Sequence, residues 1–166
     1  MKSLTLFTAM LCVVATAPSG AHDIIRHANP NMPIASSVLV PEGAELLFVS
    51  GTLADVANPS APAGSIERFG DTATQAKSVL DKLVKELAVS GFTMADVVKM
   101  NVYLVGDPRK GGAMDLEGLM KAYLQFFGLR AKEKTLPGRT TVQVAGLPVP
   151  GALVEIEVVA ARHAAH

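Results

Sequence analysis

Apolar residues recur every three or four positions in two stretches of the chain, and this spacing predicts two amphipathic helices. The first is expected over residues 69–90, ended by Gly91, and the second over residues 114–127, ended by Gly128. Their apolar positions are Ala73, Ala76, Val79, Leu80, Leu83, Val84 and Leu87 in the first, and Leu116, Leu119, Met120, Tyr123, Leu124 and Phe127 in the second. Each helix therefore has one face to bury against another layer of structure.

Short runs rich in β-branched and aromatic residues, set apart by Gly/Pro turns, predict the strands. They are expected at residues 38–40, 45–50, 97–105, 140–145 and 153–161. The first two flank Pro41-Glu42-Gly43 and are expected to form a hairpin, and the last two are expected to be neighbours joined by a Gly/Pro turn. The order ββαβαββ predicts an α+β fold, with a single mixed β-sheet and two helices packed on one face. Because the strands read as apolar on both sides, the open face is expected to pack against another copy of the chain.

Composition narrows the class of protein. The chain has 166 residues, 49% apolar and 18% charged, which suits one folded domain with an aliphatic core. The formal net charge is zero at pH 7, and it is −1 without residues 1–21, which contain one lysine and no acidic residue. A chain without a basic field is not expected to bind nucleic acid.

The first 21 residues have the order of a secretory signal peptide: Lys2, an apolar run from Leu4 to Ala17, and small residues ending at Ala21. Cleavage after Ala21 is expected, with Ala17 as the alternative. A membrane anchor is the competing interpretation, but the run is short for a span of about 20 residues. The protein is therefore expected to be periplasmic or secreted, without stable membrane association after cleavage. Cys12 is the only cysteine and lies in this segment, so the exported chain would have no disulfide or thiolate.

The rest of the chain is expected to comprise an irregular lead-in over residues 22–36, one domain over 37–162, and a tail over 163–166. All four histidines, His22, His27, His163 and His166, lie in the terminal segments. Solvated tails are favoured over a metal site there, so no metal is expected. No histidine falls inside the folded region to build a Ser-His-Asp set.

Arg139 and Glu155 lie on the two predicted closing strands, which are expected to belong to the core. A charged side chain on such a strand is unusual and requires a functional or structural explanation. The planar guanidinium of an arginine suits a carboxylate, and a glutamate can position a water or move a proton. The structural alternatives are an arginine paired with an acid across a subunit interface, and a glutamate in an ion pair on a strand edge. Glu157, two residues after Glu155, is expected to be structural.

Several segments resemble the Rid family of reactive intermediate deaminases, also called the YjgF/UK114 family. The resemblance rests on Gln75-Ala76-Lys77, residues 91–99, residues 123–127, and the closing pattern Pro137-x-Arg139, Leu147-Pro148 and Val154-Glu155-Ile156-Glu157. It extends over about residues 37–161. It implies a chorismate-mutase-like fold, assembled as a homotrimer with the sheets facing inward and with ligand pockets between subunits. It also implies hydrolysis of small enamines and imines to 2-oxo acids and ammonia, without metal or organic cofactor.

By this resemblance, Arg139 matches the arginine that holds the substrate carboxylate, and Glu155 matches the glutamate associated with the attacking water. These two are the expected catalytic residues. The expected substrate-binding residues are Arg139, Thr141, Ser37, Tyr103 and Met120.

The chain also departs from the hydrolytic members of that family. Ser37 stands near the place of a tyrosine, Met120 falls at about the place of an asparagine, and Thr140 and Thr141 replace small residues after the arginine. The alternative function is therefore a non-catalytic trimeric binding or stress protein for small carboxylates, with a holdase-type chaperone ranked last.

Overall fold

The structure is a computed structural model, and it describes residues 23–127 and 135–163. The expected signal peptide, Gly128, His22, His166 and most of the expected C-terminal tail lie outside the described residues. Among the residues that are described, no helix is long and apolar enough to cross a membrane.

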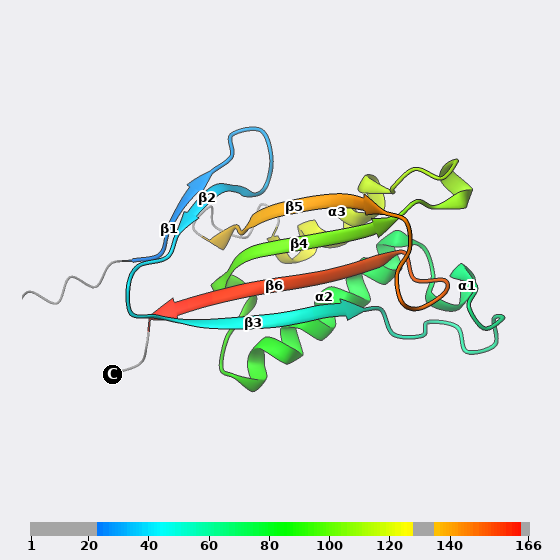
Figure 1. Ribbon diagram of the computed structural model, residues 1–166, viewed down its shortest axis with the longest axis horizontal. Coiled ribbons are helices and arrows are strands. Elements are labelled where there is room, and N and C mark those ends of the chain that lie inside the picture. The colour runs from blue at the N-terminus through cyan, green and yellow to red at the C-terminus, as the bar shows by residue number, and fades with distance from the viewer. Residues whose placement is uncertain (1–22, 128–134, 164–166) are drawn as a thin grey trace, which may run out of the picture.

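Six strands form one mixed sheet in the order β1-β2-β5-β4-β6-β3 (Figure 1). The strands are β1 (Ile25–Ala28), β2 (Ala35–Leu39), β3 (Ala44–Leu53), β4 (Val97–Val105), β5 (Gly138–Val144) and β6 (Val154–His163). Strand β5 runs parallel to β4, whereas β6 runs antiparallel to both β4 and β3. The predicted α+β class with a single mixed sheet is confirmed.

Two long helices, α2 (Thr72–Val89) and α3 (Leu116–Phe127), cover one face of this sheet (Figure 1). The side chain of Asp71 accepts a hydrogen bond of 2.8 Å from the backbone N–H of Thr74 and so caps the start of α2. The shorter helices are α1 (Ile66–Phe69) and the 3₁₀ turns η1 (Met94–Asp96) and η2 (Pro108–Lys110). The largest fully buried apolar side chains, Tyr123, Phe127, Leu80, Leu83, Leu87, Met100, Leu104, Leu119, Leu153 and Ile156, form the core between helices and sheet. Both predicted helices are therefore confirmed.

The predicted hairpin around residues 41–43 is wrong. Strand β2 pairs antiparallel with β1 and meets β5 only where Ala35 faces Gly138, while β3 pairs with β6 along nearly its whole length. A turn reverses the chain but does not choose the pairing partner, and the long β3 gains more by burying Leu47 and Val49 beside β6 and the helices.

The segment expected to be an irregular lead-in contains β1 and the start of β2. Strand β1 is short and mostly exposed, so it has no apolar alternation that a sequence pattern could reveal. The guanidinium of Arg26 ties it to the rest of the fold by donating to the carbonyls of Leu136, Ala95 and Val97 at 3.2, 3.0 and 2.9 Å.

The prediction that the two closing strands are neighbours is wrong, because β4 lies between β5 and β6. Along β4, Met100, Val102 and Leu104 are buried on the helix side, whereas Lys99, Asn101 and Tyr103 project from the open face. The open face also carries exposed Leu46, Phe48 and Val142. The expectation of strands that are apolar on both sides is therefore only partly right, because a polar row crosses the middle of the open face.

Candidate functional site

Arg139 lies near the start of β5 and projects toward α3. Its Nη1 donates to the thioether sulfur of Met120 at 3.3 Å, and its guanidinium carbon lies 4.4 Å from the centroid of the Tyr123 ring. The Tyr123 hydroxyl donates to the carbonyl of Pro33 at 2.9 Å, which fixes the ring beneath the cation. Helical spacing predicts Tyr123 as an apolar residue of the second helix, and its side chain is indeed buried in the core. The contact of its ring with the Arg139 guanidinium cannot be inferred from that spacing.

The guanidinium of Arg139 is a cation in partly dry surroundings. In the described part of the chain, no carboxylate pairs with it; the ion pairs there join other residues. Burial lowers the pKa of Arg139, while the neighbouring Tyr123 opposes this shift. Arginine stays charged in proteins, so this partly buried charge would gain from an anionic ligand.

Glu155 lies on β6 and projects from the open face of the sheet. Its carboxylate rests against Gly51 on β3, where a β-carbon would overlap Oε1 of Glu155. Gly51 falls in the irregular stretch of the β3–β6 ladder, between Val49 and Thr52, and its φ angle is not positive. The residue is therefore a glycine that makes room for Glu155, not one that the backbone conformation requires.

Glu157 sits beside Glu155 on the same face and is held by two neighbours on β4. Its Oε1 accepts hydrogen bonds from Asn101 Nδ2 at 2.8 Å and from the Tyr103 hydroxyl at 3.0 Å. The bond to Glu157 is the largest cause that raises the pKa of Tyr103, with desolvation and the charges of both glutamates adding to it. A hollow of about 240 Å³ adjoins this cluster and includes Phe48, Ser50 and Lys99 in its lining.

The predicted site residues fall into two groups on opposite faces of the sheet. Arg139 and Met120 touch on the helix side, and Thr141, two residues after Arg139 on the same strand, shares its face. Glu155 and Tyr103 are paired across β6 and β4 on the open side. Ser37 is exposed on β2, and no hydrogen bond within the described residues joins it to either group. One chain by itself therefore does not bring Arg139 and Glu155 to a common ligand.

Thr141 differs from the other predicted residues in one respect. Its hydroxyl oxygen is buried and has no hydrogen-bond partner in the described part of the chain. Burying an unpaired hydroxyl is unfavourable, so this group needs an explanation.

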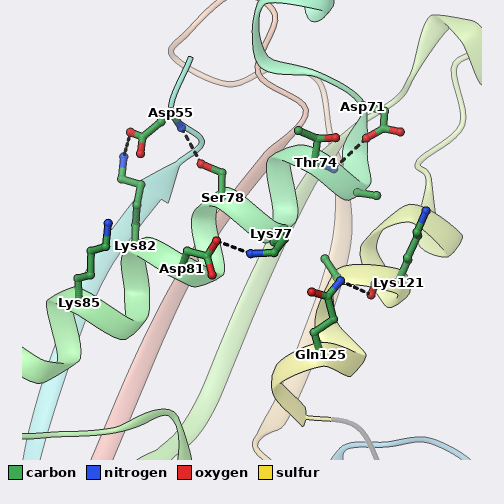
Figure 2. Close-up of a pocket in the computed structure, with 12 residues that line it drawn as sticks. Asp55, Asp71, Thr74, Lys77, Ser78, Asp81, Lys82, Lys85, Lys121 and Gln125 are labelled. Carbon is green, nitrogen blue, oxygen red and sulfur yellow. Dashed lines mark hydrogen bonds and ion pairs between the residues drawn. The ribbon is translucent and has the colours of Figure 1, made fainter. Parts of the chain in front are cut away.

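A larger groove lies on the outer side of the helix layer, between α2 and α3 (Figure 2). Its volume is about 480 Å³, and it is lined by Asp55, Asp71, Ala73, Thr74, Lys77, Ser78, Asp81, Lys82, Lys85, Lys121, Ala122 and Gln125. Ion pairs between Lys77 and Asp81 (2.6 Å) and between Lys82 and Asp55 (3.0 Å) neutralise much of its charge. None of the predicted site residues lines this groove, and we interpret it as a solvated surface between two amphipathic helices.

Potential metal ligands do not gather in the residues that the structure describes. No group of three or more His, Cys, Asp or Glu side chains there has the arrangement of a metal site. His163 lies 3.5 Å from Asp23, and both side chains are largely exposed.

Comparison with known proteins identifies the family. Residues 31–162 match the family model described as Endoribonuclease L-PSP. A RutC family protein of Pyrococcus horikoshii is 28% identical over 139 residues, covering 83% of this chain and 96% of the relative. Protein DfrA of Myxococcus xanthus is 30% identical over 128 residues, covering 77% and 84%. A crystal structure of a Rid family protein of unknown function from Yersinia pestis superposes with a TM-score of 0.60 at 24% identity, covering 83% and 96%.

The chain belongs to this family, whose members include the Rid and YjgF proteins, and the resemblance seen in the sequence is confirmed. The fold is confirmed with it, because the sheet covered by two helices matches the solved structures.

Proposed function

We propose that the protein hydrolyses small 2-imino acids and their enamine forms to 2-oxo acids and ammonia, in clefts between copies of the chain. The observation that carries this proposal is Arg139: a partly buried cation, without a carboxylate partner among the described residues, held between Met120 and the Tyr123 ring. Such a group is prepared to bind the carboxylate that every 2-imino acid has.

Arg139 positions the substrate in this proposal. Its planar fork can donate two parallel charge-assisted hydrogen bonds to one carboxylate. The Tyr123 ring beneath the guanidinium limits its movement through a cation–π contact. A substrate held in this way presents its imine carbon in a fixed direction, and orientation of this kind lowers the barrier for attack by water.

Glu155 acts as the general base for the attacking water in this proposal. Its carboxylate accepts a proton as the water oxygen attacks the imine carbon, and the proton is then passed to the nitrogen. The carbon now bears one hydroxyl and one amino group. The hydroxyl proton then moves through the same carboxylate to the nitrogen, the carbon–nitrogen bond breaks, ammonia leaves, and the carbon becomes the carbonyl of the 2-oxo acid. Because Glu155 lies on the open face and Arg139 on the helix face, the Glu155 that serves a given Arg139 would come from a neighbouring copy.

A homotrimer with inward-facing sheets would supply that neighbour. The exposed apolar side chains of the open face, Leu46 (48% exposed), Phe48 (73%) and Val142 (40%), support an assembly that covers this face. The polar row formed by Lys99, Asn101 and Glu157 would then lie at or near the contact between copies.

The test is the loss of freshly generated 2-iminobutanoate in the presence of the chain from residue 22 onward. We expect the wild type to accelerate hydrolysis, and Arg139→Ala to lower kcat/KM at least about a hundredfold. Arg139→Lys should also fail, because an ammonium lacks the fork.

Arg109→Lys is the matched control for turnover, because Arg109 pairs with the buried Asp107 and hydrogen-bonds to none of the proposed site residues. Preparations of this variant that are shown to be folded should keep wild-type turnover. A chelator should not reduce the activity, since the proposed chemistry uses no metal. Full activity of Arg139→Lys would contradict the carboxylate clamp.

The alternative function is binding of small carboxylates without turnover. It is favoured by Met120, whose apolar side chain contacts the guanidinium at about the place where the hydrolytic members have an asparagine. Saturable binding of 2-oxobutanoate that depends on Arg139, without faster imine hydrolysis, would support this alternative.

We further propose that the protein is exported, on the strength of the signal-like order of residues 1–21. The mass of the mature protein recovered from an expressing bacterium tests this, and cleavage after Ala21 is the expected result. A chain that keeps residues 1–21 in the cytoplasm would contradict it.

A further inference from the structure

Met120 is the α3 residue whose sulfur touches Arg139. The sulfur lies 3.3 Å from Nη1, and a thioether is only a weak hydrogen-bond acceptor. The guanidinium is thus poorly satisfied on that side, and the Tyr123 ring covers it on another. Met120 is only partly buried, so small solutes can reach part of its side chain.

We propose that Met120 is an oxidation site, and that its sulfoxide occupies Arg139 and weakens carboxylate binding. This inference rests on the proposed role of Arg139 as a carboxylate clamp. The oxidant is a peroxide, with hydrogen peroxide as the simplest case. The sulfur attacks one peroxide oxygen, a sulfur–oxygen bond forms, and the oxygen–oxygen bond breaks. The sulfur loses two electrons, and the second oxygen leaves as water after taking up the proton of the transferred oxygen.

Oxidation changes what Met120 offers to Arg139. A sulfoxide oxygen is a much stronger acceptor than a thioether sulfur, and it would form next to a cation that has no carboxylate partner in the described chain. The three rotatable bonds of methionine let the sulfur move back while its new oxygen accepts from Nη1. A carboxylate could then bind only after this internal hydrogen bond is broken, which should weaken its binding about tenfold.

The other methionines provide an internal comparison. Met100 is fully buried in the core, whereas Met32 is 45% exposed in the segment between β1 and β2. Peroxide should oxidise Met32 readily, but its sulfur makes no hydrogen bond to Arg139. Met32 is therefore the matched control for oxidation without the proposed effect.

In the experiment, the purified chain from residue 22 onward is treated with hydrogen peroxide. Its binding of 2-oxobutanoate is measured by calorimetry before and after the treatment. Mass spectrometry identifies each methionine that has gained one oxygen atom. Wild type and Met32→Leu should lose about tenfold in affinity, and methionine sulfoxide reductases should restore it. Met120→Leu keeps a similar volume and cannot be oxidised, so its affinity should not respond to peroxide. Each variant is compared with its own untreated sample.

A second readout needs no ligand. The chain has no Trp and two Tyr, so Tyr103→Phe leaves Tyr123 as the fluorescent reporter beneath Arg139. If the sulfoxide draws the guanidinium toward it, oxidation should change Tyr123 emission, and Met120→Leu in the same background should abolish that change. If Tyr123 emission changes on oxidation in a protein that does not bind 2-oxobutanoate, the oxidation site at Met120 stands and the proposed function is wrong. Three results would overturn the inference: unchanged affinity in a protein whose Met120 is oxidised, an equal loss of affinity in Met120→Leu, or a Met120 that resists peroxide while Met32 reacts.

Discussion

The carboxylate of Glu155 lies against the backbone of Gly51 on the neighbouring strand, in space that a β-carbon on residue 51 would occupy. The φ angle of Gly51 is open to any residue, so the absence of a side chain, and not the backbone conformation, is what this position contributes. The glycine thereby sets where the carboxylate of Glu155 can rest on the open face.

Gly51→Ala should therefore leave the fold intact and displace the Glu155 carboxylate. We expect kcat/KM for 2-iminobutanoate to fall about tenfold or more, because a small misplacement of a reacting group is costly. Glu155→Asp in the Gly51→Ala background should restore part of the activity, since the shorter side chain leaves room for the new methyl group. Gly146→Ala is the control, because Gly146 has an ordinary φ angle and nothing within 4 Å of the added carbon. An active Gly51→Ala variant would show that the position of Glu155 is not critical.

The placement of Arg139 and Glu155 on opposite faces leads to a complementation experiment. Arg139→Ala and Glu155→Gln should each be inactive alone, but chains of the two variants refolded together should recover activity. If each site takes one residue from each of two neighbouring copies, random mixing leaves roughly one quarter of the sites intact. The expected result is therefore recovery of about a quarter of wild-type activity. No recovery, in mixed assemblies whose presence is shown by native mass spectrometry, would contradict a site shared between copies.

Much of the fold could be predicted from the sequence because its signals are local. The helical spacing of Leu80, Leu83 and Leu87 marks the buried face of α2, and the alternation of Met100, Val102 and Leu104 marks that of β4. Strand pairing could not be predicted in the same way. The separation of β5 from β6 by β4 depends on contacts between residues far apart in the chain, which a local turn signal does not report.

The candidate site shows the same division. Arg139 and Glu155 could be singled out because charges on apolar strands are unusual, and the resemblance to a known family added their expected roles. The face that each side chain takes depends on register within the sheet, and one position of slip would reverse it. The support of Arg139 by Tyr123, and the space that Gly51 leaves for Glu155, are tertiary contacts that no spacing along the chain could indicate.

Thr141→Val separates a binding role of this residue from a structural one. Its buried hydroxyl has no partner in the described structure, so replacing it with a methyl group should raise the free energy of unfolding by about 1 kcal/mol. If Thr141 also contacts substrate, KM should rise while stability increases. Urea unfolding and steady-state kinetics on the same preparations test both effects, with Thr141→Ser as the variant that keeps the hydroxyl. A loss of stability in Thr141→Val would mean that the hydroxyl finds a partner after all.

The raised pKa of Tyr123 predicts that the folded protein loses stability at alkaline pH. Burial raises its pKa to about 12, from an ordinary value of 10.0, although the charge of Arg139 opposes the shift. Because the folded pKa lies above the unfolded one, the stabilisation by the neutral phenol is fully present below pH of about 10 and is lost as the pH rises through about 12. The free energy of unfolding should fall over this range, and much less so in Tyr123→Phe.

Ultraviolet absorbance of the phenolate in Tyr103→Phe, which leaves Tyr123 as the one tyrosine in the sequence, measures the folded pKa directly. Replacing the cation in Arg139→Met should move that pKa higher still, because the charge that favours the phenolate is gone. This shift tests the contact between the two side chains independently of any substrate. Titration of Tyr123 near pH 10, unchanged by the loss of Arg139, would contradict the buried pairing on which the carboxylate clamp depends.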